Sequence, residues 1–147
     1  MAFKFSTGLR NAVLGTDSAR ATLEGGVINI YSDAVPATAD AALGGATLLV
    51  TISNDGGGGG LNFDAIAADG LLVKDPGQIW KGEIAAGGTA TFFRWVMDGD
   101  TGGVSDSEVR IQGAVGMAGT DMVLSNTALT ATEDQILDSF VLAFPAG

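Results

Sequence analysis

Closely spaced aspartates make residues 98–103, DGDTGG, the part of the chain that most resembles a calcium loop. Asp98, Asp100 and Asp106 could supply carboxylate oxygens, which calcium prefers as ligands. A complete EF-hand loop also needs a bidentate Glu at its twelfth position, where this chain has Val109. A turn rich in Asp and Gly explains the same residues without a metal. We therefore predict no metal site, and weak calcium binding by Asp98 and Asp100 stays open.

Catalysis would have to come from carboxylates or lysines, because the chain has no histidine and no cysteine. Histidine is the commonest general base near neutral pH, and cysteine is a common nucleophile. A glycosidase needs two carboxyl groups about 5 to 9.5 Å apart. The available side chains include Glu24, Lys81, Glu83, Glu133 and Asp134. Sequence alone does not bring any two of them together, and we predict that the protein is not an enzyme and holds no cofactor.

The charge of the chain disfavours nucleic acid as a partner. The chain has 17 acidic and 7 basic residues and a net charge of −10 at pH 7, so it would repel a phosphate backbone. The acids are spread singly, which is typical of a solvated surface. There is no apolar run of about 18 residues, so we predict no membrane-spanning helix. The first residues lack the apolar core of a secretory signal, and we expect a leaderless protein made in the cytoplasm.

Most of the elements that would position these residues are β-strands. Residues 1–20 are expected to form an arm with a short helix, which Ser6 or Thr7 caps and Gly15 ends. From residue 21 on, apolar and polar residues alternate in short segments bounded by Gly, Asp, Asn and Pro. The candidate strands are GVINIYSD, ATLLVTISN, GLLVKD, QIWKGEIA, TATFFRWVM, EVRIQGAVG, MVLSNTALT and ILDSFVLAF.

About eight short strands separated by turns are typical of an antiparallel sandwich or barrel. A length of 147 residues suits one domain with one core. The chain contains no cysteine, so no disulfide can hold the domain together. We predict an all-β protein, a single-domain antiparallel β-sandwich that is jelly-roll-like and spans residues 21–147, preceded by the N-terminal arm.

Five consecutive glycines at residues 56–60 allow three interpretations. As a linker they would need a stable core on each side, yet the residues before them offer only one short helix and two good strands. As a phosphate cradle they would need a following helix and usually a lysine next to Ser or Thr, and neither follows here. We predict a flexible surface loop between two strands.

Apolar residues outside the expected core mark a candidate interface. Arg94 alternates with Phe92 and Val96, which indicates a sheet face that is partly open or covered by another chain. Phe3 and Phe5 lie in the arm, where apolar residues are typical of a docking strap. The sandwich is expected to fold without residues 1–15. The predicted interface consists of Phe3, Phe5, Leu9, Arg10, Phe92 and Arg94.

Segments along nearly the whole chain resemble a family of small virion proteins of tailed bacteriophages. They are FKFSTGLRNAVLG, GVINIYSDAVPATADAALG, LLVTIS, GLNFD, IWKGEIAAGGTATFFRW, VRIQGAVG and ILDSFVLAFPAG. The size and expected architecture are also similar to those of jelly-roll capsid cement proteins, which bind the outside of the phage head. The resemblance implies a decoration protein of the virion head surface. Its partners would be the major capsid protein and further copies of itself, as a homodimer or homotrimer.

A tail- or fibre-associated module that binds a receptor glycan is the alternative function. It would use exposed aromatic side chains, and Tyr31, Trp80 and Trp95 are the candidates. Aromatic residues within alternating strands more often belong to the core, and we predict that these three are buried.

Overall fold

The structure, a computed structural model, describes residues 3–143 of the chain. Two short helices lie near the start of a body made of β-strands, which confirms the prediction of an all-β sandwich-like fold with a short N-terminal helix. The elements in chain order are β1 (Lys4–Phe5), α1 (Thr7–Gly15), α2 (Ala19–Leu23), β2 (Val27–Tyr31), β3 (Leu48–Asn54), β4 (Leu71–Val73), β5 (Trp80–Glu83), β6 (Gly88–Thr89), β7 (Phe92–Val96), β8 (Arg110–Gly116), β9 (Met122–Val123), β10 (Ala128–Leu129), β11 (Asp134–Leu137) and β12 (Val141–Ala143).

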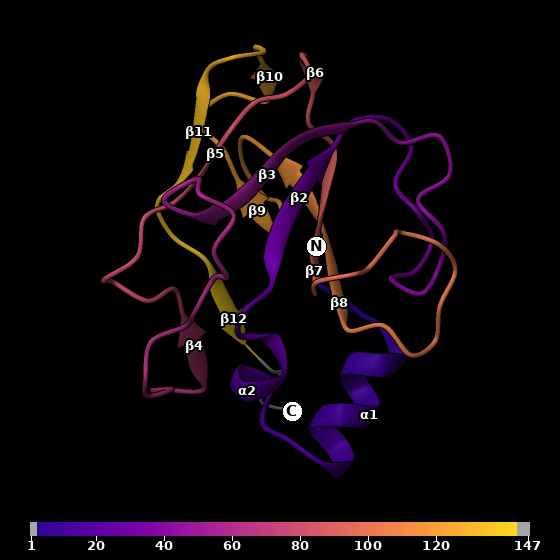
Figure 1. Ribbon diagram of the computed structural model, residues 1–147, viewed down its shortest axis with the longest axis vertical. Helices are drawn as coiled ribbons and strands as arrows, with labels where there is room; N and C mark the ends of the chain where they lie inside the picture. The colour runs from indigo at the N-terminus through magenta and orange to yellow at the C-terminus, as the bar shows by residue number, and fades with distance from the viewer. Residues whose placement is uncertain (1–2, 144–147) are drawn as a thin grey trace.

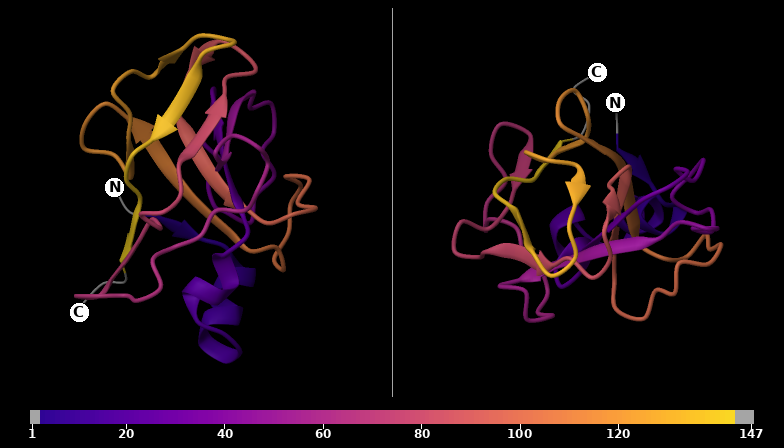
Figure 2. Two further views of the ribbon diagram at one scale, coloured as in Figure 1. Left: turned by 60° about the vertical axis from the view of Figure 1, so that its left-hand side comes forward. Right: turned by 90° about the horizontal axis from the view of Figure 1, so that it is seen from above.

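Eight strands form one sheet that curls around the core (Figures 1 and 2). Seven follow the order β1-β8-β7-β2-β3-β5-β11, and β9 pairs with β8 in parallel. The ends of this order meet, because Phe3 beside β1 stacks on Phe140 after β11 with ring centroids 5.7 Å apart. A jelly roll divides its eight strands between two sheets. Here the opposite walls of one curled sheet form the two layers, and β6–β10 and β4–β12 are separate pairs.

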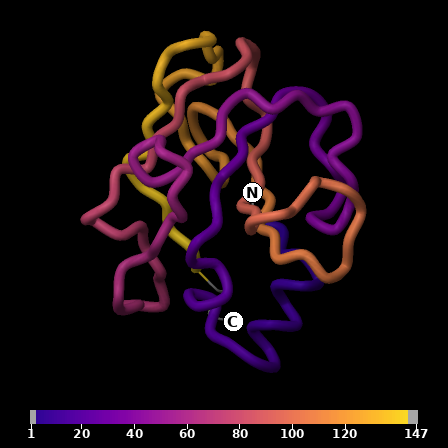
Figure 3. Tube along the Cα trace, viewed as in Figure 1, coloured from indigo at the N-terminus to yellow at the C-terminus, as the bar shows by residue number. Residues whose placement is uncertain are grey.

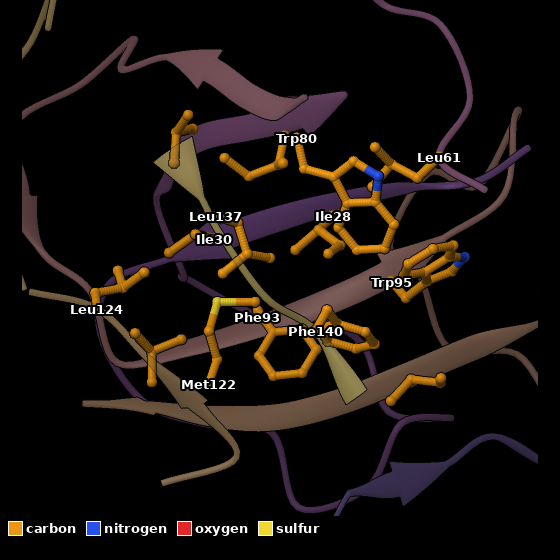
Figure 4. Close-up of a cluster of buried hydrophobic side chains, with 14 of the residues drawn as sticks. Ile28, Ile30, Leu61, Trp80, Phe93, Trp95, Met122, Leu124, Leu137 and Phe140 are labelled. Carbon is orange, nitrogen blue, oxygen red and sulfur yellow. The ribbon is translucent and has the colours of Figure 1, made fainter. Parts of the chain in front are cut away.

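The core fills the inside of the curled sheet (Figure 4). Alternation along the strands points Ile28 and Ile30 of β2 and Phe93 and Trp95 of β7 inward, and all four are fully buried. Phe140 lies among their side chains and contacts five aromatic rings, which belong to Phe3, Phe63, Trp80, Phe93 and Trp95. Phe140 and the aromatic rings around it therefore connect the two walls.

The chain's own loops cover the outer face of the sheet. The loop of residues 32–47 joins β2 to β3, the loop of residues 97–109 joins β7 to β8, and Figure 3 shows them on the same side of the molecule. They are hydrogen-bonded to each other, since the Leu43 amide donates to the Gly102 carbonyl at 3.0 Å. β7 is consequently buried on both faces. The sequence predicts that this face is either partly open or covered by another chain. The structure shows that loops of the same chain cover it.

The N-terminal residues are integrated into the domain. β1 pairs with β8 at the edge of the sheet, and Leu9 of α1 is buried in the core cluster. Ser6 is the N-cap, as predicted, and its Oγ accepts a hydrogen bond from the Leu9 amide at 3.1 Å. The helix ends at Gly15, also as predicted. Removing residues 1–15 would take away an edge strand and the buried Leu9, so we expect the truncated chain to be less stable, and the expectation that the sandwich folds without these residues stays a prediction.

The last predicted strand, ILDSFVLAF, is divided in two. β11 ends at Leu137, β12 begins at Val141, and the residues between them carry Phe140 into the core. The side chain of Ile136 is 49% exposed, while Leu137 and Phe140 are buried, so the buried residues on the two sides of the break do not alternate as in one strand. Residues 138–140 belong to no strand and let the chain pass from β5 to β4, which a continuous strand could not do. Phe144, the end of the predicted strand, lies outside the described residues.

The glycine run is a surface loop, as predicted, with a hydrogen-bonded backbone. The Asn54 amide donates to the Gly59 carbonyl at 2.9 Å, and the Gly58 amide donates to the Ser53 hydroxyl at 3.0 Å. Gly60 lies directly against Gly25, so that a Cβ at residue 60 would stand 2.5 Å from the Gly25 Cα. The run therefore ends in a close backbone contact that only glycine permits.

We expect Gly60→Ala to destabilise the protein by about 1–3 kcal/mol, because the added methyl group must displace the Gly25 backbone. Gly59→Ala is the matched control, since its Cβ would meet only the Asn54 Cβ, at the ordinary distance of 3.7 Å. Urea unfolding of both variants measures the difference. Equal stability of the two variants would show that the Gly25 backbone moves away from residue 60 at little cost in stability.

Candidate functional site

The predicted interface residues separate into two groups. Leu9, Phe92 and Arg94 are 4%, 0% and 0% exposed, so they offer almost no area to a macromolecule docking on the surface. The prediction that these three residues lie in an interface is wrong, because they lie in the interior. Phe3 and Phe5 are half-buried beside the sheet edge.

Arg10 is exposed on helix α1, where a hollow of about 170 Å³ opens next to it. Its walls are formed by Phe5, Leu9, Arg10, Val13 and Leu14. Leu14 is 86% exposed although it is apolar. Figure 2 shows α1 projecting from one end of the sheet. We call these five residues the α1 hollow.

Beneath the loops, a buried polar cluster lies on the outer face of the sheet. Arg110 donates to both carboxylate oxygens of Asp100, from Nε at 2.6 Å and from Nη2 at 2.7 Å. Arg94 donates from Nε to Gln112 Oε1 at 2.8 Å, as expected for residues paired across β7 and β8. The exposed fraction of both side chains of the Asp100–Arg110 ion pair is 1%. This cluster was not predicted.

Each long side chain of the cluster also holds the covering loop. Gln112 donates to the Pro36 carbonyl at 2.7 Å, and Arg110 donates to the Ala39 carbonyl at 3.1 Å. Arg94 donates from Nη2 to the carbonyl of Ala41 at 2.7 Å. These bonds satisfy backbone acceptors that burial would otherwise leave unpaired. The cluster thus fixes the loop of residues 32–47 on the sheet.

The charges of the cluster influence one another. Burial lowers the pKa of Arg94, and the nearby Arg110 guanidinium lowers it further. Hydrogen bonds to Asp100 raise the pKa of Arg110. Burial alone would raise the pKa of Asp100, but the hydrogen bonds from Arg110 and the Gly102 amide outweigh it, and the pKa is lowered. Two cations and one anion leave the cluster with a net charge of +1.

One of the two aspartates of DGDTGG is bound within the domain. Asp100 is engaged by Arg110 and by the Gly102 amide, whose nitrogen lies 2.8 Å from Oδ1. Asp98 and Asp106 are exposed. Within residues 3–143, no group of three or more acidic side chains is placed to hold a metal ion. The segment is a turn whose second aspartate neutralises a buried arginine.

Three of the carboxylates considered for catalysis lie at the pair of strands β5 and β11. Glu83 of β5 pairs in register with Asp134 of β11, and Asp134 and Glu133 line a hollow of about 320 Å³. All three are exposed. Glu24 forms a salt bridge with Arg20 at 2.9 Å, far along the chain from the others. Two of the candidates are therefore neighbours, and no buried donor or aromatic platform accompanies them among the lining residues.

The aromatic candidates for glycan binding are in the interior. Trp80 and Trp95 are 0% exposed, and Tyr31 is 5% exposed, which confirms the prediction that they are buried. The Tyr31 ring stacks on Phe92 at 5.0 Å on the outer face of the sheet. None of these three rings offers a flat surface to a sugar.

Lowering the pH below about 4 is expected to destabilise the protein. The hydrogen bond from the Thr7 hydroxyl lowers the pKa of Asp40, and the pKa of Asp100 is also lowered in the folded state. In the acidic range the unfolded chain therefore binds more protons, so the stabilisation present above the unfolded pKa is lost as the pH falls. Urea unfolding at several pH values measures this slope. Asp40→Asn should make the slope shallower, and an unchanged slope would contradict the role of Asp40.

Comparisons of the chain with protein-family models, curated proteins and solved structures gave no match. In the described part of the chain, neither helix has the length and apolarity that a membrane crossing requires. The geometry therefore carries the functional argument, and its two features are the α1 hollow and the buried polar cluster.

Proposed function

We propose that the protein is a bacteriophage capsid cement protein that docks on the head through the α1 hollow. The observation that carries this proposal is the apolar hollow at a projecting end of the molecule, where Leu14 is 86% exposed. Contiguous exposed apolar surface marks protein–protein contacts, and the hollow with Leu14 is the apolar surface that α1 offers to a partner. The acidic surface and the resemblance to phage virion proteins agree with a structural role.

The partner is the major capsid protein at the head surface. An apolar segment of a capsid subunit would fill the hollow, and Arg10 at its rim would pair with a carboxylate of that subunit. Sister copies, as a dimer or trimer, would place several hollows around one symmetry axis of the capsid. Weak single contacts would then add through effective concentration.

Leu14→Gln is expected to lower the affinity for heads at least about fivefold, since losing an apolar interface side chain costs about 1 kcal/mol or more. The fold should be retained, because this side chain is exposed. Val104→Gln is the matched control, as Val104 is 81% exposed and is not among the residues lining the hollow.

The measurement adds purified protein to heads that lack it and determines occupancy and resistance to heat. Reduced occupancy for Leu14→Gln alone supports docking through α1. Equal occupancy for both variants would exclude the hollow as the docking surface. Failure of the unmodified protein to bind heads would exclude the cement function and favour the tail module.

A further inference from the structure

One guanidinium nitrogen of the buried polar cluster has no partner. Arg94 is 0% exposed and uses Nε and Nη2 in hydrogen bonds to Gln112, Thr38 and Ala41. Among the described side chains, its Nη1 is the buried polar atom that has no hydrogen-bond partner. A charged donor left unsatisfied in the interior is costly, so an acceptor from outside the chain would stabilise this nitrogen.

A pocket of about 330 Å³ lies at this arginine. Its floor is the outer face of β2 and β7, and its rim comes from the two covering loops. The residues that line it are Asn29, Tyr31, Leu43, Ala46, Leu48, Arg94, Val96, Asp100, Thr101 and Gly102. The volume is at the small end of the range of about 300–1,000 Å³ that is usual for ligand sites. The pocket therefore suits a small molecule.

The polar groups of the pocket are arranged to donate hydrogen bonds. Asn29 is paired in register with Arg94, and its Oδ1 accepts from the Thr51 hydroxyl at 2.8 Å. Burial raises the pKa of Tyr31, and the Asn29 side chain forms a hydrogen bond with its hydroxyl group. The hydroxyl thus stays protonated near neutral pH and can donate its hydrogen into the pocket. Arg94 also lines the pocket, and its Nη1 is the donor that has no partner.

Charge and shape narrow the ligand further. The cluster below the pocket has a net charge of +1, from two arginines and Asp100, within a chain whose net charge is −10. One anionic charge would neutralise the cluster. It would also offset the repulsion between Arg110 and Arg94, which together with burial lowers the pKa of Arg94. Leu43, Leu48 and Val96 add an apolar wall. A planar monoanion with an apolar body matches these features better than a dianionic phosphate.

We infer that this pocket is a binding site for a small organic carboxylate, whose oxygens accept hydrogen bonds from Arg94 Nη1 and the Tyr31 hydroxyl. The apolar part of the ligand lies against the wall formed by Leu43, Leu48 and Val96. Because both covering loops line the pocket, the bound ligand joins them to the sheet. Binding at this site is independent of docking through the α1 hollow.

The test uses the only tyrosine of the chain as its probe. The full-length protein is labelled with carbon-13 in the tyrosine ring and titrated with acetate, benzoate, inorganic phosphate or chloride at constant ionic strength. We expect saturable shifts of the Tyr31 signal with the carboxylates, stronger for benzoate than for acetate. Phosphate and chloride are expected to give no saturable shift.

Two variants place the binding in this pocket without removing the buried arginine. Ala46→Phe fills the pocket from its rim and should abolish the benzoate shift. Ala42→Phe is the matched control, because Ala42 is exposed on the same loop and is not among the lining residues. A far-ultraviolet spectrum and a melting curve confirm that both variants are folded.

Three results would overturn the inference. No saturable shift with either carboxylate would mean that water, and not a carboxylate, accepts the hydrogen bond from Arg94 Nη1. Saturation by phosphate but not by carboxylates would show that the ligand is not a carboxylate. Retained benzoate binding in Ala46→Phe would move the site elsewhere on the protein.

Discussion

Asp100→Asn is expected to destabilise the fold by about 3–5 kcal/mol, because it leaves the buried guanidinium of Arg110 without its counter-ion. The substitution changes the charge and almost nothing of the shape. Both side chains of the pair are 1% exposed, so water cannot replace the carboxylate. The loss should appear as a lower urea midpoint with an unchanged slope.

Two comparisons separate this effect from other causes. Asp98→Asn, two residues earlier and exposed, should change stability by less than about 0.5 kcal/mol. Asp100→Leu combined with Arg110→Met removes both charges and should be less destabilising than Asp100→Asn alone. A loss of under about 1 kcal/mol for Asp100→Asn would show that the ion pair contributes no more than a surface salt bridge.

Phe140→Ala is expected to cost about 3–5 kcal/mol, because it opens a cavity where the ends of the sheet meet. The Phe140 ring lies 5.7 Å from Phe3 and 5.9 Å from Phe93, on the opposite wall. No other residue of the β11–β12 connection is buried in the core. The effect tests whether one side chain between strands holds the curled sheet closed.

Val141→Ala is the matched control for this substitution. Val141 is the next residue and is 43% exposed, so its truncation should cost less than about 1 kcal/mol. Thermal and urea unfolding of both variants give the comparison. Similar losses for the two variants would mean that the walls are closed by the rest of the core and not by Phe140.

The strands were predictable where alternation is continuous. The pattern in β2 and β7 gave the correct inward faces, and Ser6 and Gly15 gave the bounds of α1. In β3 the start of the pattern failed, because Leu49 is buried in the core and Leu48 is exposed beside the register shift between β2 and β3. The pattern in ILDSFVLAF is apolar on both faces and does not reveal a break. The break at Asp138 depends on which strands the two halves join, β5 and β4, and pairing partners are not encoded locally.

The buried polar cluster was missed for the same reason. The apolar residues that flank Arg94 in the sequence predict an interface at this position. Arg110 and Gln112 alternate on β8 in a similar way, which was an unused signal of a polar row within a strand. Only the register that sets Arg94 opposite Gln112 shows that the two polar sites form one cluster. Asp100 is the counter-ion of Arg110, and the DGDTGG motif in which it lies does not indicate this pairing.

Imaging virions that contain this protein tests the central proposal most directly. The cement function predicts density for the protein on the outside of the head, repeated at a symmetry axis of the capsid lattice, with α1 facing the major capsid protein. Density only on the tail or a fibre would contradict it, as would the absence of the protein from the virion.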